Sequence, residues 1–436
     1  MNRLLSASVK ALSTTILMAS WVVQPAQSLE VGPFTLNGFV KLEVSRASNQ
    51  CVGCQTFPNE ERHKPWADTI ADGKPYGTRD GTLSLFQPYL GTRHFDLGQG
   101  LKVRGLLSQR WRDGKVDIPG VWYEKNLIFT HEDHGMLQVG AFPTRSWSWA
   151  DFPYGTTLGI ADPWASSGAG YGLLTRAIRY GTPLLDVAGG DLYLELTYDQ
   201  GDANWRTQKP SLWEGVARYV KGPWMIDLIG QHAQNGQAVA WGHAPFVGVT
   251  TVPTLDANPA YRVPGNEQSI VMLMARYQFD VKTDLYGGVR FNRWSGSPGV
   301  PTGRDTNNNL IWANMFNVQT GDINVAHGAT STDFNLGVVH RFKPQWSVRA
   351  AAVHFGKAST DNPSDRGQHN SMWLGTVGLG YEIQPGWSVY GYAGMVEFAR
   401  KGLAPLSMPA HTAFTGVDPR VSKNGNWAGL GMVYVF

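Results

Sequence analysis

The chain lacks several features that mark helical membrane proteins, nucleic-acid-binding proteins and common enzymes. Downstream of its first residues it has no run of about 20 apolar residues, which excludes a transmembrane helix there. It has no dense run of Lys or Arg and no nucleic-acid-binding motif, so no nucleic acid partner is expected. The motifs G-x-S-x-G and H-E-x-x-H are absent, and the histidines are scattered. We therefore expect no enzyme activity, no metal and no cofactor.

Cysteine is also rare, with Cys51 and Cys54 as the 2 cysteines of the chain. They lie downstream of Met1 to Ser28, which has the positive start, short apolar core and small-x-small end of a cleaved secretory signal peptide. In an exported chain the expected state of the pair is a disulfide. A metal site would need a second pair of ligands, and c-type haem attachment would need His where Gln55 stands.

Alternation of apolar and other residues is what the sequence has in abundance, and the last stretch, Asn426 to Phe436, displays it most clearly. Its residues divide into two faces with a period of two, as the side chains of a strand do. The stretch ends on Phe436, with Tyr434 two residues earlier. A closed membrane barrel uses such rings in its apolar band and aromatic girdle, and its last strand must pair with the first because lipid tolerates no open edge.

The same unit recurs along the chain as two alternating strands joined by a tight turn and followed by a long polar loop. Trp224, Trp346 and Trp387 each follow a tight turn, where an interfacial aromatic belt would lie. The inward faces of the strands carry polar residues, whereas a β-sandwich would need them apolar. A propeller would show a fixed repeat, and none is found. The pattern predicts an all-β, transmembrane antiparallel β-barrel of about 16 strands, an even number as bacterial barrels have.

The terminal strand, the strand count and the segment Met136 to Thr182 resemble Gram-negative outer-membrane porins, most closely the betaproteobacterial general-porin type. That segment runs through a strand, G-A-F, a long loop and R-A-I-R-Y-G-T-P. The resemblance covers Leu29 to Phe436, the expected barrel domain after the signal peptide. It implies a homotrimer of water-filled barrels in the cell outer membrane, an inward-folded third loop and passage of small hydrophilic solutes. It also implies contact with outer-membrane lipid and with the barrel-assembly machinery through Phe436.

Strand alternation assigns an excess of basic residues to the pore lining. The inward bases are Lys41, Arg93, Lys102, Arg104, Arg110, Arg179, Arg218, Arg276, Arg290, Arg341 and Arg349. The inward acids are Glu43, Glu124, Glu195, Glu214, Asp227, Asp333 and Glu382. This excess predicts a weak preference for anions. The alternative is that these charges pair across strands and only fill the barrel.

The loop from Pro143 to Leu173 is the predicted constriction. It is rich in Trp and Gly, and its acids are Asp151 and Asp162, which would face the arginines of the opposite wall. Porins often carry a short acidic, glycine-rich motif in this loop, so the difference leaves pore size and selectivity open. The alternative is an outer loop whose rings pack on its neighbours.

The function predicted from the sequence is a passive diffusion channel with weak anion preference. One alternative is a substrate-specific channel for short amides, urea or sugars, and the aromatic loop would be its distinguishing feature. Another is an outer-membrane enzyme such as a phospholipase, which would need a Ser/His pair on the lipid-facing surface.

Overall fold

The computed structural model describes residues 28–48, 79–116, 122–160, 164–165, 172–201, 209–236, 246, 266–296, 299–304, 310–314, 327–361, 367, 369–400 and 423–436. Outside these ranges lie the expected signal peptide apart from Ser28, both cysteines and Asp162. The predictions made for them therefore stay predictions.

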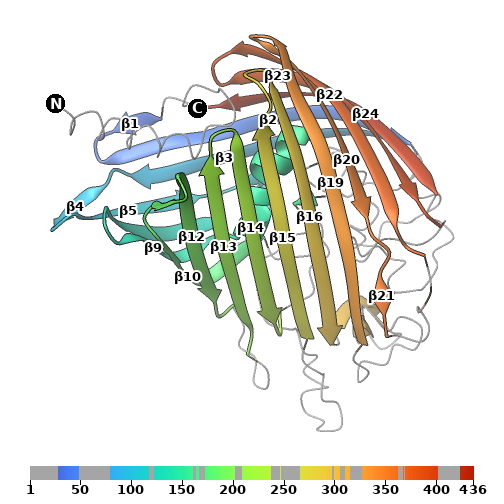
Figure 1. Cartoon of the computed structure of the whole chain (residues 1–436), viewed down its shortest axis with the longest axis horizontal. Helices are drawn as coiled ribbons and strands as arrows, with labels where there is room; N and C mark the ends of the chain where they lie inside the picture. Colours follow the sequence, from blue (N-terminus) through green and yellow to red (C-terminus); the bar gives the residue numbers. More distant parts are fainter. Residues whose placement is uncertain are drawn as a thin grey trace.

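In the described part of the chain, sixteen strands form one closed antiparallel barrel, which confirms the predicted fold class (Figure 1). The barrel strands are β2 (Phe34–Ser48), β3 (Arg79–Thr92), β5 (Leu101–Ser108), β8 (Glu124–His131), β9 (Gly135–Pro143), β10 (Leu173–Gly181), β12 (Gly190–Asp199), β13 (Ser211–Lys221), β14 (Trp224–Gln234), β15 (Asn266–Gln278), β16 (Thr283–Gly296), β19 (His327–Lys343), β20 (Trp346–Phe355), β22 (Met372–Gln384), β23 (Trp387–Phe398) and β24 (Asn424–Val435). Shorter strands are β1 (Leu29–Val31), β4 (Phe95–Gly98), β6 (Trp111–Arg112), β7 (Lys115–Val116), β11 (Leu185–Val187), β17 (Gly299–Arg304), β18 (Leu310–Asn314) and β21 (Ser359–Thr360).

The barrel closes where β24 pairs with β2, in a register that sets Lys41 opposite Val433. Beyond the ladder, the amide of Phe436 donates to the carbonyl of Gly38 at 3.0 Å, and the amide of Gly38 donates back at 2.9 Å. A Cβ at Gly38 would overlap the backbone oxygen of Gln87 and lie 2.9 Å from the Phe436 ring. Glycine is therefore required at the point where the two ends of the barrel meet.

The outward face carries an aromatic girdle at each end of the strands. Near the tight turns, cross-strand ring pairs have centroids 4.5 Å apart (Trp224–Tyr277, tilted), 4.7 Å apart (Trp346–Tyr381, tilted) and 4.4 Å apart (Trp387–Tyr434, stacked). At the opposite ends, the pairs are Tyr198–Trp213 at 4.6 Å and His354–Trp373 at 4.4 Å. Exposed Leu, Val and Phe side chains fill the band between them. This is the arrangement predicted for the tryptophans that follow tight turns.

The inward face differs from the polar lining that the sequence predicts. From β13 to β24 much of it is apolar and buried, and Ile229, Met272, Val353 and Leu374 are typical members. These side chains are covered by a helical segment inside the ring of strands (Figure 1). Because the covering segment excludes water, the wall beneath it is packed like an ordinary protein core.

That segment consists of α2 (Arg145–Trp149), η3 (Ala150–Gly155) and α3 (Thr156–Leu158). Among the described residues, no helix has the length and apolar composition needed to cross a membrane.

Candidate functional site

The third loop, Pro143 to Leu173, leaves β9, folds into α2, η3 and α3 within the barrel, and returns as β10. Thr144 caps α2, and its hydroxyl accepts a hydrogen bond from the amide of Trp147 at 3.2 Å. α3 ends at Gly159, whose φ of +75° suits glycine. The predicted inward fold of this loop is confirmed.

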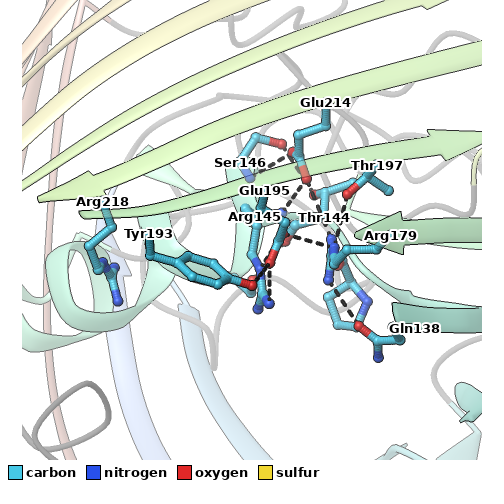
Figure 2. A network of polar contacts seen from close by, with 12 residues as sticks. Gln138, Thr144, Arg145, Ser146, Arg179, Tyr193, Glu195, Thr197, Glu214 and Arg218 are labelled. Atoms are coloured by element: carbon cyan, nitrogen blue, oxygen red, sulfur yellow. Dashed lines mark hydrogen bonds and ion pairs between the residues drawn. The ribbon is translucent and has the colours of Figure 1, made fainter. Parts of the chain in front are cut away.

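The root of the third loop is fixed by two buried glutamates from neighbouring strands (Figure 2). Glu214 of β13 accepts the amides of Arg145 at 2.7 Å and Ser146 at 2.9 Å. Glu195 of β12 accepts the Arg145 guanidinium through Nε at 2.8 Å and Nη2 at 2.9 Å. The first amides of a helix have no hydrogen-bond partner within the helix, and Glu214 accepts two of them. Its negative charge also interacts favourably with the positive end of the helix dipole.

Arg179 of β10 completes this root cluster. Its Nε lies 2.9 Å from Glu195 and its Nη2 lies 3.6 Å from Glu214, and Nη2 also donates to the Pro143 carbonyl at 3.0 Å. Two guanidinium groups thus face two carboxylates, which is the condition for burying these charges. Burial disfavours the charged form of Arg145, but the attraction of Glu195 outweighs burial and raises the pKa of Arg145.

Trp149, at the end of α2, lies beside two guanidinium groups. The Arg218 guanidinium is 3.7 Å from its ring centroid and that of Arg145 is 5.0 Å away. Arg218 in turn makes a bidentate ion pair with Asp227, with distances of 2.6 Å and 2.8 Å. The planar guanidinium can stack on a ring and bond a carboxylate at the same time.

The far end of the third loop is attached to strands across the lumen. The hydroxyl of Tyr154 donates to Asp227 of β14 at 2.9 Å, and burial, followed by the charge of Asp227, raises the pKa of Tyr154. The hydroxyl of Thr376 on β22 donates to the carbonyl of Leu158 at 3.3 Å. These contacts join a loop that starts at β9 to the opposite side of the barrel.

Trp164 is a fully buried aromatic anchor of the loop. Its carbonyl accepts from the Arg290 guanidinium at 2.6 Å, and its indole N–H donates to the sulfur of Met274 at 3.4 Å. Arg290 also pairs with Asp333 at 2.9 Å. The arginine is therefore held by one carboxylate and binds the loop backbone with its remaining donors.

Asp151 and Phe152 lie on the water-exposed side of the loop. The Thr156 hydroxyl donates to Asp151 at 2.5 Å within the loop, and Phe152 is 39% exposed. Arg349 of β20 donates to the carbonyl of Thr156 at 3.2 Å. The Thr156–Asp151 hydrogen bond therefore joins two residues of the same loop. Arg349 contacts the loop at the backbone carbonyl of Thr156.

On the wall formed by β3, β5 and β8, Tyr89 has the loop residue Asp151 among the charges that act on it. The charges of Glu124, Arg110 and Asp151 all act on the hydroxyl of Tyr89, so the loop carboxylate lies within electrostatic range of that wall. Arg110 is buried just beyond the end of β5.

Several other predicted bases are neutralised by acids. Arg276 and Arg341 share Asp284, at 2.8 Å and 3.0 Å. Lys41 lies 3.2 Å from Glu43 on the same strand. Asp284 and Arg145 are not among the residues predicted from the sequence for the lumen. Asp284 lies six residues before Arg290 on the same strand, so the period of two places it on the inward face as well. Arg145 lies in a loop, where side-chain direction follows no such period.

Arg93 lies outside the strands, because β3 ends at Thr92, and it pairs with Glu30 near the turn. Lys102 and Arg104 make no ion pair with any described residue, and the Nε of Arg104 is buried without a hydrogen-bond partner. His94 lies nearby: partial burial, then the charges of Arg104 and Lys102, lower its pKa. A positive region thus lies at the turn end of β5.

Comparison with known proteins adds only structural likeness. No family model matches the chain, and no curated protein matches by sequence. An anion-selective porin from Comamonas acidovorans is similar at 13% identity over 92% of this chain and 99% of its own, with a TM-score of 0.53. The outer membrane channel DcaP of Acinetobacter baumannii is similar at 11% identity over 94% and 99%, with a TM-score of 0.55. OmpT, an outer membrane protein of Vibrio cholerae described in a trimer form, is similar at 10% identity over 92% and 99%, with a TM-score of 0.54.

At these identities the likeness establishes the fold alone. The class that the fold defines is the closed sixteen-stranded antiparallel β-barrel with a loop folded inside it.

Proposed function

We propose that this chain is a diffusion channel of the Gram-negative outer membrane that passes small hydrophilic solutes and ions. The observation that carries the proposal is the third loop, which crosses the lumen of a closed barrel and is fastened at its root by Glu214 and at its far end by Arg290. The proteins of similar fold include one named as an anion-selective porin and one named as an outer membrane channel. A homotrimer of the betaproteobacterial general-porin type, exported by cleavage after Ser28, is part of this proposal.

The outward face supports a location in lipid, because its apolar band lies between two aromatic girdles. Phe436, hydrogen-bonded into the closing seam, would be the element that the barrel-assembly machinery recognises. Solutes would be sieved where Asp151 and Phe152 face the wall that carries Tyr89.

We further propose a weak anion preference. It comes from the few basic residues of the lumen that are not paired with acids. The arginines of β10, β13, β15, β16 and β19 are paired with acids, so their fields largely cancel. The excess is assigned to Lys102, Arg104 and Arg349, none of which makes an ion pair with a described acid; Arg349 bonds the carbonyl of Thr156, so Lys102 and Arg104 are the two to vary.

The test is single-channel recording in planar bilayers under a salt gradient. The wild type should show a reversal potential of anion sign. Lys102→Glu with Arg104→Glu should move it toward cations, and less so at high salt because lumen charges in water are screened. Lys282→Glu with Lys343→Glu makes the same change in charge near exposed turns and should leave the potential nearly unchanged. No conductance at all would reject the channel, and a cation sign in the wild type would reject the preference alone.

A substrate-specific channel is the second candidate, favoured by the exposed ring of Phe152 on a loop that also holds Trp147 and Trp149. A series of neutral solutes, including short amides, urea and sugars, separates the two. Diffusion predicts flux that rises linearly with concentration, whereas a specific site predicts saturation.

An outer-membrane hydrolase has one observation in its favour. His232 and Ser269 lie on the outward faces of β14 and β15, and Nδ1 of the ring is 2.8 Å from the hydroxyl oxygen. No described residue hydrogen-bonds the other ring nitrogen, and similar pairs join Thr283 to His340 at 3.0 Å and Ser371 to His369 at 2.9 Å. We therefore assign the His232–Ser269 contact a structural role, in which each side chain satisfies the hydrogen-bonding group of the other at the barrel surface. Lipase activity in detergent that disappears in Ser269→Ala would overturn this assignment.

A further inference from the structure

An apolar groove of about 400 Å³ runs along the outward face over β3, β5, β8 and β9. Leu90, Leu107, Leu127 and Val139 form much of its lining. The groove exists because β3 and β5 pair only between Tyr89↔Ser108 and Gly91↔Leu106, and because Gly105 adds no side chain. It has the shape and composition to hold a hydrocarbon chain.

A cation lies at the groove. Lys125, the second residue of β8, is exposed and is one of the residues that line it. Its ammonium has no ion pair with any residue in the described ranges. An outward-facing lysine in a barrel is unfavourable toward the middle of a membrane but inexpensive near its surface, where its head can reach a polar partner.

A second cation lies on the same face. Lys125 pairs with Ala141 of β9, and a bulge in β10 sets Thr175 and Arg176 opposite the same alanine. Arg176 is exposed, and its charge also acts on Asp199. Two strand spacings separate Lys125 from Arg176 by about 10 Å. Ala141, which lies between the two cations, adds only a methyl group there.

The level of this pair along the barrel fits a lipid headgroup. Lys125 is the second residue from the loop end of β8, and Trp213, in the girdle at that end of the barrel, is the third residue from the loop end of β13. Aromatic girdles mark the boundary between hydrocarbon and headgroups. The cations therefore lie near that boundary, and the groove extends from it toward the hydrocarbon band.

We propose that this groove binds a phosphate-bearing lipid of the outer leaflet, with the phosphate at Lys125 and Arg176 and an acyl chain along Leu107, Leu127 and Val139. The proposal rests on the outer-membrane location proposed above. One molecule then accounts for both the apolar groove and the cation beside it. A second groove, of about 530 Å³, lies over β22, β23, β24 and β2 and has no Lys or Arg in its lining, so it offers an internal comparison.

The experiment is native mass spectrometry of the full-length barrel in detergent, titrated with diphosphorylated lipid A or with the same glycolipid lacking phosphate. The variants are Lys125→Glu, which reverses the charge, and Gly105→Leu, which fills the groove. A Cβ at Gly105 would lie 3.7 Å from Leu127 and 3.9 Å from Thr92, which is ordinary contact distance. Gly391→Leu fills the second groove and is the control; a Cβ there would lie 3.1 Å from the end of the exposed Leu430 side chain, which must shift by a few tenths of an ångström.

Each of the two variants should weaken binding of the phosphorylated lipid by about tenfold or more, while Gly391→Leu leaves it unchanged. Removal of the phosphates should weaken binding to the wild type in the same way. Equal binding by wild type and Lys125→Glu would overturn the proposal. So would a Gly105→Leu variant that binds lipid normally but no longer self-associates, since the groove would then be an interface between copies. Conductance in synthetic bilayers without this lipid tests the channel separately.

Discussion

Several arginines inside the barrel are held by carboxylates from adjacent strands. Arg218 with Asp227 and Arg290 with Asp333 are buried pairs in which each acid accepts more than one donor. A buried carboxylate left without its partner keeps its desolvation cost and loses the attraction that offset it. These pairs therefore contribute chiefly to the structure of the lumen wall.

Arg218→Ala should lower the free energy of unfolding by about 3–5 kcal/mol, because Asp227 stays buried without its guanidinium partner. Urea-induced unfolding in lipid vesicles, followed by tryptophan fluorescence, measures this change. Lys423→Ala removes the exposed pair with Glu397, whose side chains are 56% and 60% exposed, and is the control. It should cost less than about 1 kcal/mol. Equal losses of stability in the two variants would show that the buried pair contributes no more than the exposed pair.

Alternation in the sequence predicted which face of the barrel Arg218 and Asp227 occupy, since side-chain direction follows from a period of two. It could not predict that they bond each other, because that depends on the register of β13 on β14. Arg145 could not be found in this way, as it lies in a loop.

At the scale of elements, the third loop is a structural part of the barrel as well as its proposed constriction. Its rings pack on apolar residues of the far wall, so removal of the loop would expose those residues to water. The sequence predicted the inward loop through its resemblance to porins and its aromatic content. It did not predict the attachment points, because Glu195 and Glu214 lie about 50 and 70 residues from Arg145 along the chain.

Glu214→Gln should loosen the root of the loop. A carboxylate accepts both amides of the first turn, whereas a carboxamide has one oxygen and would turn its NH₂ group toward the other amide. We expect a loss of about 1–3 kcal/mol in stability and more noise in the open-channel current. Glu382→Gln, on β22 near a turn, is the control. Unchanged noise and stability in Glu214→Gln would show that the loop is held without this contact.

At the scale of the whole molecule, closure depends on one glycine and one terminal ring. The sequence predicted that the last strand pairs with the first, because an open edge is not tolerated in lipid. It could not predict the place of Gly38, which is set by the approach of Gln87 and Phe436 from either side. Nor did it predict the apolar part of the lumen, since a strand covered on both faces loses its alternation.

Gly38→Ala should hinder closure, because the added methyl group would overlap the backbone oxygen of Gln87. The melting temperature of the folded barrel, read from its heat-dependent shift on gels, should fall. Gly215→Ala is the matched control, since a Cβ at Gly215 has nothing within 4 Å. A melting temperature of Gly38→Ala equal to that of the control would show that the seam adapts to a side chain.

In the proposed function, solutes and ions pass through the lumen beside the third loop. The direct measurement is the current through single channels that carry Phe152→Cys, with Cys51 and Cys54 replaced by Ser, before and after addition of a bulky water-soluble thiol reagent. Phe152 is 39% exposed on the loop, and Val281→Cys, at a turn residue that is 85% exposed, is the control. Modification at residue 152 should reduce the current, and modification at residue 281 should not. Complete labelling of residue 152 with an unchanged current would show that ions do not pass beside this part of the loop.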